Sequence, residues 1–153
     1  MTWIKPSFMW MLYRTAWATE PSQEHVLAIR ISRHGFEWAL AYSCLSSYDS
    51  GVCASPAEWL ERKRTSPIRV QWDPERARDL TALPWRSIQI GLSGQAVHNY
   101  VNRWTVQIDD VTTLVKCARS STAKIWRHEL DTLLSCEKPY PLSESLKTTI
   151  RAS

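Results

Sequence analysis

Four segments of this sequence alternate apolar and polar residues with a period of two: 25–32, 68–72, 86–92 and 105–109. Successive side chains of a β-strand point to opposite faces, so each segment predicts a strand that buries one side. Strands of a doubly wound parallel sheet would be apolar on both sides. The alternation therefore predicts an α+β fold. We expect a single mixed, largely antiparallel sheet of about four to five strands, with helices packed on one of its faces.

Helix signals occupy the stretches between the strand segments. Apolar residues recur at helical spacing in four stretches: 6–17, 36–45, 97–104 and 112–134. The last of these is interrupted near 120–122. Ser55 before Pro56 is typical of a helix N-cap followed by proline in the first turn, and Pro67 is expected to end that helix.

Residues 73–76, with the sequence DPER, favour a turn, because Asp can bond its own downstream backbone and Pro presets a turn dihedral. The last residues, 136–153, are expected to form a polar tail. At 153 residues the chain is most simply a single domain, 1–153, long enough to bury roughly 70% of its unfolded surface.

The composition is that of an ordinary globular protein. Hydrophobic residues make up 44% of the chain and charged residues 22%, without a disordered or fibrous bias. The four cysteines include no C-x-x-C pair and the histidines show no metal-ligand spacing, so we expect reduced thiols and no bound metal. The net charge of +4 is small for a nucleic-acid-binding face. No apolar segment is long enough for a membrane span, so we expect a cytoplasmic protein; nothing specifies an oligomeric state.

The polar sides of the four strand segments carry amide and guanidinium groups as well as hydroxyls. They are Arg30, Arg69, Gln71, Ser87, Gln89, Thr105 and Gln107. An amide both donates and accepts hydrogen bonds, so glutamines beside arginines suit a cleft that binds a polar ligand. A solvated outer face of an antiparallel sheet has the same alternation, and both interpretations stay open. The cleft requires Arg30, Gln71 and Gln89 to converge on one hollow.

The turn at 91–94, Gly-Leu-Ser-Gly, resembles a phosphate-binding loop only in its glycines. A P-loop needs a lysine after its second glycine, and a nucleophile elbow needs glycine where Gln95 stands. Ser93 is instead expected to be the N-cap of the helix that follows.

The segment 6–17 predicts an aromatic helix bracketed by Lys5, Tyr13 and Arg14. Such a helix is either a stacking platform with cations or a core helix whose long polar side chains reach the solvent. We expect Trp10 to lie in the core, and the role of Arg14 stays open.

Longer motifs carry a family resemblance. WIKPSFMWMLYRTAW, VLAIRISRHGFEWAL, SPIRVQWDPER and RSIQIGLSGQAVHNYV resemble the family catalogued as domain of unknown function 4291, from Trp3 to about the KPYPL segment. The resemblance implies no settled activity. Members of that family carry a further N-terminal stretch with strand character before the counterpart of Trp3, so it implies a shortened chain or gene model.

The same pattern is similar, more weakly, to the ADP-ribosyltransferase fold, in which strands like VLAIRI, RSIQIGL and TVQIDDV alternate with helices. In that fold a later strand contributes the polar residue that activates the acceptor, usually glutamate, and the matching position here is Gln89. Glutamine cannot act as a carboxylate base, but it can orient a ribose hydroxyl. The resemblance implies that Arg30 or Arg86 neutralises a pyrophosphate. The first NAD-clasping strand would lie upstream of Met1, which implies weak binding.

We therefore expect a nucleotide-binding domain with NAD as its implied cofactor, in which Gln89 and Gln71 are the catalytic residues that orient the ribose. The candidate ligand-binding residues are Lys5, Ser7, Trp10, Tyr13, Arg14, Arg30, Asp73 and Arg86, with Arg14, Arg30 and Arg86 on the phosphates. The alternative is a non-catalytic module in which the aromatic helix and basic residues bind RNA or a protein partner. A third hypothesis is an inactive, shortened family member.

Overall fold

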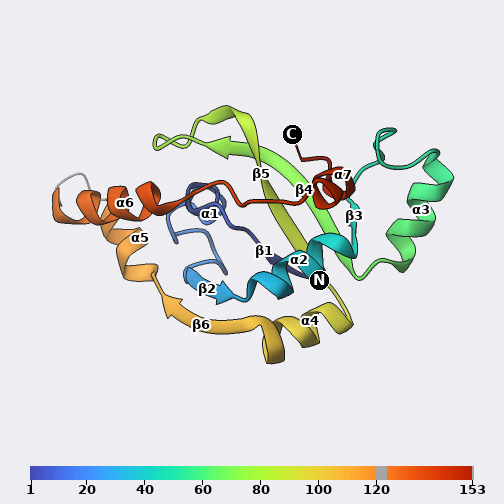
Figure 1. The fold of residues 1–153 in the computed structure, drawn as a ribbon. Helices are drawn as coiled ribbons and strands as arrows, with labels where there is room; N and C mark the ends of the chain where they lie inside the picture. The colour runs from blue at the N-terminus through green and yellow to red at the C-terminus, as the bar shows by residue number, and fades with distance from the viewer. Residues whose placement is uncertain (120–123, 153) are drawn as a thin grey trace.

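The computed structural model of the chain, which describes residues 1–119 and 124–152, contains two β-sheets (Figure 1). The larger sheet has four strands in the order β1 (Thr2–Ile4), β5 (Ala82–Leu92), β4 (Ile68–Arg76) and β3 (Ser43–Leu45). Neighbouring strands are antiparallel, except that β3 and β4 are parallel. The smaller sheet is the antiparallel pair β2 (Leu27–Ile31) and β6 (Thr105–Asp110). The α+β class and the mixed, largely antiparallel pairing are confirmed.

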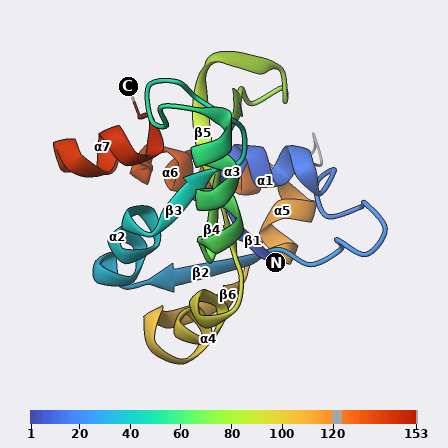
Figure 2. The ribbon, with the colours of Figure 1, turned by 90° about the vertical axis from the view of Figure 1, so that its right-hand side faces the viewer.

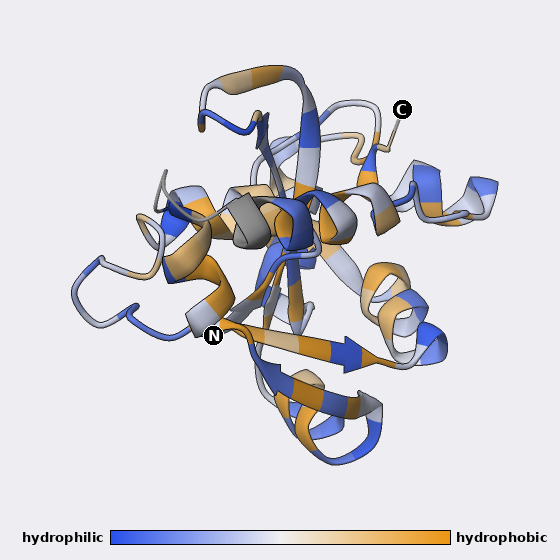
Figure 3. Ribbon diagram, turned by 90° about the vertical axis from the view of Figure 1, so that its left-hand side faces the viewer, coloured by the Kyte–Doolittle hydropathy of each residue, from blue (hydrophilic) through white to orange (hydrophobic). Residues whose placement is uncertain are grey.

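The expectation of a single sheet is wrong, because β2 and β6 pair only with each other among the described residues. Hydrophobic and hydrophilic residues alternate along β6, whereas β2 is a mostly apolar run interrupted by one hydrophilic residue (Figure 3). Ile29 and Ile31 pack against the main core, but the expected burial of the apolar side is wrong for β6, whose Val106 and Ile108 are exposed. Alternation thus predicted which residues share a face of each strand, but it does not specify the neighbouring strand.

Seven α-helices surround the sheets in the described part of the chain (Figures 1 and 2). They are α1 (Phe8–Arg14), α2 (Arg33–Ala41), α3 (Pro56–Thr65), α4 (Gln95–Asn99), α5 (Thr112–Arg119), α6 (Lys124–Cys136) and α7 (Glu144–Ile150). The Ser55 hydroxyl accepts a hydrogen bond from the Glu58 amide and caps α3, as expected. The expected helix break near 120–122 lies outside the described residues. The segment expected to be a polar tail contains α7, and its Ile150 is buried.

The main hydrophobic core lies on one face of the larger sheet, where alternate residues of β4 and β5 are inaccessible to solvent. Helices α2 and α7 cover this face, together with α4 and the π-helical turn 100–104 that continues it. A second hydrophobic cluster joins α1, α5 and α6. Helices were expected on one face only, but α1 contacts β4 beside the polar side chains of the other face.

Two local expectations about turns and caps are wrong. Ser93 is not an N-cap: its Oγ donates to the Pro67 carbonyl at 2.8 Å, and α4 begins after Gly94 without a side-chain cap. Residues 73–76 do not form a turn, because β4 continues to Arg76 with a register shift after Pro74. Proline is tolerated in a strand at such an irregularity, where no ladder hydrogen bond is lost.

Replacing Gly35 by alanine is expected to lower the free energy of unfolding by about 1–3 kcal/mol, because the added methyl overpacks the core. A Cβ at this position would lie 2.3 Å from Cγ of Trp104, whose ring is buried against Trp38. Thermal unfolding of the variant measures the loss. Ala41→Gly, at the end of the same helix, is the control. A decrease in melting temperature for Gly35→Ala no larger than that for Ala41→Gly would show that the Trp104 indole moves aside freely.

Candidate functional site

The candidate site is the polar face of the larger sheet, which we define by Trp3, Lys5, Gln71, Asp73, Ser87 and Gln89. These residues come from β1 and the segment after it, from β4 and from β5. The strand register places Gln71 opposite Gln89 and Asp73 opposite Ser87. Within 68–73 of β4 and 87–92 of β5, the odd-numbered residues point to this face, because the even-numbered ones fill the core on the other face.

Lys5 and Asp73 form the central ion pair of the polar face. Lys5 Nζ lies 2.8 Å from Asp73 Oδ2, and the Lys5 side chain is only 1% exposed. The same Nζ lies 3.7 Å from the centre of the Trp10 ring. Burial lowers the pKa of Lys5, although its hydrogen bond to Asp73 acts in the opposite direction. The two partners are 68 positions apart, so the pair joins the N-terminal segment to β4.

Hydrogen bonds extend this pair into a network. Gln71 Nε2 donates to Asp73 Oδ1 at 2.8 Å. Ser7 Oγ caps α1 by accepting from the Trp10 amide and donates to Glu75 Oε1 at 2.7 Å. The network therefore fixes the start of α1 over the end of the polar face.

Two polar groups of this face have no side-chain partner among the described residues. The Ser87 hydroxyl is buried and has no hydrogen-bond partner in the described structure. Gln89 is half-buried, and no described side-chain group bonds its amide. A buried hydroxyl without a partner costs free energy unless a water or ligand supplies one. Ser87 and Gln89 are two residues apart on one strand and so present a hydroxyl and an amide side by side.

Trp3 supplies an aromatic surface beside Gln89. Trp3 pairs with Gly91 on β5, and a Cβ on Gly91 would lie 2.9 Å from the Trp3 ring. The absence of a side chain at Gly91 lets the indole lie close against the strand, with 46% of the residue exposed. The sequence signal for this arrangement is Gly91 inside the strand segment 86–92, because a glycine within a strand indicates close approach of another group.

The structure brings together six of the ten predicted site residues in one connected region. They are Lys5, Ser7, Trp10, Gln71, Asp73 and Gln89. Tyr13 lies farther along α1, where its ring stacks with the Arg76 guanidinium at 3.6 Å.

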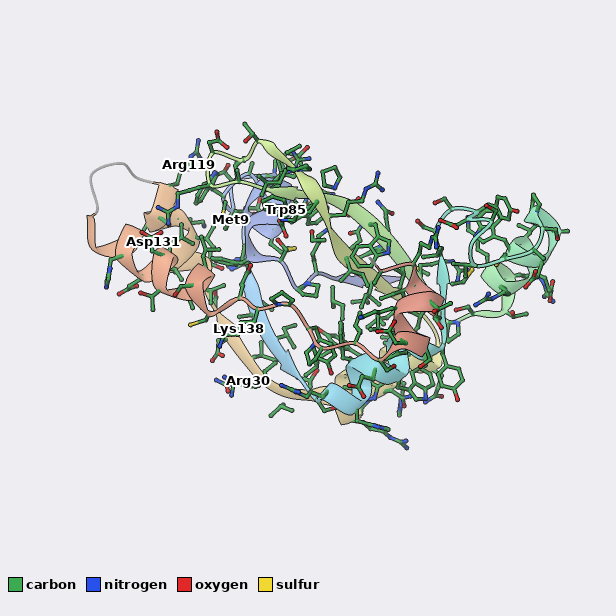
Figure 4. All side chains as sticks on the ribbon, turned by 45° about the horizontal axis from the view of Figure 1, so that its top comes forward. Met9, Arg30, Trp85, Arg119, Asp131 and Lys138 are labelled. Atoms are coloured by element: carbon green, nitrogen blue, oxygen red, sulfur yellow. The ribbon has the colours of Figure 1, made fainter. Side chains whose placement is uncertain are left out.

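The three arginines expected on phosphates do not join this region. Arg30 is exposed on β2, opposite Gln107 in the smaller sheet, and lies well apart from Trp85 on β5 (Figure 4). The expected convergence of Arg30 with Gln71 and Gln89 is therefore wrong. Arg14 is exposed at the end of α1. Arg86 alternates with Ser87 along β5 and points away from the polar face.

The polar face suits a neutral, hydrogen-bonding ligand better than a polyanion. Its nearest cation, Lys5, is already paired with Asp73, and Glu75 and Glu137 add negative charge. Burial raises the pKa of Glu137, whose Oε1 accepts a hydrogen bond from the Phe8 amide. Sequence reasoning missed Glu75 and Glu137 because their contacts are with α1, which is distant in sequence.

Within residues 1–119 and 124–152, no three His, Cys, Asp or Glu side chains are grouped as a metal site. In the same part of the chain, every helix is too short or too polar to cross a membrane.

Comparison with known proteins identifies one family. Its model, described as a domain of unknown function (DUF4291), matches residues 1–140. Neither the curated proteins nor the solved structures yield a match.

Proposed function

The chain belongs to the DUF4291 family, and from this premise we propose that it binds a nucleoside moiety, such as a ribosyl end of NAD, on the polar face of its larger sheet. The observation that carries the proposal is the open Gln89 amide beside the unpartnered Ser87 hydroxyl and the exposed Trp3 ring. In this proposal the Gln89 amide bonds the ribose hydroxyls, and the indole stacks on the base.

The weaker resemblance to ADP-ribosyltransferases supports the same strand, because Gln89 stands at the position of the acceptor-activating residue. Glutamine orients a hydroxyl without taking its proton. Two carboxylates of the neighbouring strand β4 already have partners: Asp73 accepts a hydrogen bond from Lys5, and Glu75 accepts one from Ser7. We therefore propose that Gln89 and Gln71 position the ribose, and that any transfer to an acceptor proceeds without a carboxylate base at position 89.

Replacing Gln89 by leucine is expected to weaken NAD binding about three- to tenfold, because one or two neutral hydrogen bonds to the ribose are lost. Trp3→Ala is expected to weaken it by a similar or larger factor, since stacking on an aromatic ring contributes about 1–3 kcal/mol per base. Isothermal titration calorimetry with NAD into the millimolar range measures both effects.

Gln107→Leu is the matched control, because Gln107 is an exposed glutamine on β6, in the other sheet. It should bind NAD like the unmodified protein. The proposal is wrong if Gln89→Leu and Gln107→Leu bind NAD with equal affinity, or if the unmodified protein gives no heat of binding with NAD.

Binding of single-stranded RNA is a second candidate, favoured by the exposure of both Trp3 and Arg14. Phosphate contacts would make the RNA affinity fall steeply with salt. NAD binding on the polar face should depend little on salt, because Lys5 is already paired. Salt titrations of the two ligands therefore separate the two candidates.

A further inference from the structure

A hollow of about 720 Å³ lies at the outer edge of β4. Strand β3 ends at Leu45, and the Ser46 amide bonds the Val70 carbonyl, so β4 continues beyond its neighbour from Gln71 onward. The loop 46–49, the segment 84–86 and residues 151–152 form the remaining walls. The volume falls within the range of small-molecule sites, about 300–1,000 Å³.

Two guanidinium groups give the hollow its charge. Arg86 Nη1 makes a long hydrogen bond of 3.4 Å to the Trp72 carbonyl, and Arg86 is exposed. Arg151 Nε lies 3.6 Å from Asp49 Oδ1, and its side chain is 62% exposed. With two arginines and one aspartate in the lining, most of the guanidinium donors are free to bind an anion.

The backbone holds Arg151 in place at the end of α7. Arg151 adopts a left-handed conformation with φ of 57°, and the Ala152 amide closes the helix by bonding the Lys147 carbonyl at 2.9 Å. A non-glycine residue in this conformation requires support from its surroundings. The Arg151 guanidinium also packs against the backbone of the loop at Gly51, since a Cβ on Gly51 would lie only 2.8 Å from Arg151 Cζ.

Aromatic rings supply the second recognition element of the hollow. Trp85 is 59% exposed although it belongs to a strand of the larger sheet. Tyr48 faces the same hollow from the loop after β3. Trp72 is oriented by the hydrogen bond from its Nε1 to the Ile150 carbonyl at 2.7 Å. Large exposed rings beside free guanidinium groups are typical of sites for ligands that combine a flat ring with an anion.

We propose that this hollow is a second binding site, for a planar aromatic ring that carries a phosphate, of the class of a nucleoside monophosphate. Arg86 and Arg151 bind the phosphate, and the ring packs on Trp85. The hollow and the polar face are centred on different residues, because Trp3, Lys5, Asp73, Ser87 and Gln89 are not part of the hollow's wall. Gln71 is the one glutamine in the wall, at the edge that both regions share.

The test is calorimetric titration of the full chain with uridine 5′-monophosphate, uridine and inorganic phosphate. The monophosphate should bind more tightly than either fragment, because only it uses the ring and the charge together. Arg86→Gln should weaken its binding about tenfold or more, as expected for loss of a charge-assisted hydrogen bond. Trp85→Ala should also weaken it. Arg64→Gln, in an exposed pair with Glu61 on α3, is the matched control and should bind normally.

Equal affinity for uridine and its monophosphate, or unchanged binding by both Arg86→Gln and Trp85→Ala, would overturn the proposal. Circular dichroism of each variant establishes that it is folded. Saturating monophosphate should leave the affinity for NAD unchanged. A different result would place NAD in the hollow. In that case the monophosphate displaces NAD, and NAD binding is weakened by Arg86→Gln but not by Gln89→Leu. That result would reject the polar-face proposal and support the hollow.

Discussion

Replacing Asp73 by alanine is expected to lower the free energy of unfolding by about 3–5 kcal/mol, the typical loss when one partner of a buried ion pair is removed. The variant leaves the Lys5 ammonium without its carboxylate in a position where the side chain is 1% exposed. It also removes the acceptor of the Gln71 amide. Urea unfolding followed by circular dichroism measures the loss as a lower midpoint with an unchanged slope.

The double variant Lys5→Met with Asp73→Leu identifies the cause. Apolar residues of similar volume leave no buried charge, so the double variant should be more stable than Asp73→Ala. Glu144→Ala is the surface control, because it breaks the exposed pair with Lys147 on α7 and should have little effect. A loss in Asp73→Ala no greater than in Glu144→Ala would show that Lys5 does not need its partner.

Replacing Ile90 by alanine is expected to cost about 2–5 kcal/mol of unfolding free energy. Ile90 is fully buried in β5, between Ile4 of β1 and Val70 of β4. The smaller side chain loses its transfer free energy and leaves a cavity between strands that cannot collapse fully. The same urea titration measures the change.

Ile108→Ala provides the matched control for Ile90→Ala. Ile108 is also an isoleucine within a strand, but it is 58% exposed on β6. Its truncation should change stability only slightly, because little of its surface is buried. Equal losses at the two positions would mean that the core of the larger sheet is not where the structure places it.

Much of the local structure could be predicted from the sequence, because its causes are local. Period-two alternation gave strands at β2, β4, β5 and β6, and the Ser55-Pro56 signal gave the start of α3. Local chemistry failed where a distant group competed with it. Ser93 bonds the Pro67 carbonyl rather than the helix amides.

The candidate site was predictable in its residue types but not in its geometry. Lys5, Ser7, Gln71 and Asp73 were predicted as site residues, yet nothing local indicated that Lys5 bonds Asp73 and Ser7 bonds Glu75, each across 68 positions. Arg30 had the same alternation signal as Gln71 and lies in the other sheet. The hollow at β4 escaped prediction because its wall combines a strand edge, a loop and the residues after α7.

By itself, the sequence determined the α+β class and which side of each strand is apolar, because the alternation of side chains along a strand is a property of the local backbone. The tertiary structure alone decided which strands are neighbours, which polar groups are paired and which remain open. These outcomes depend on contacts between segments far apart in the chain, and identical local patterns are compatible with several such pairings.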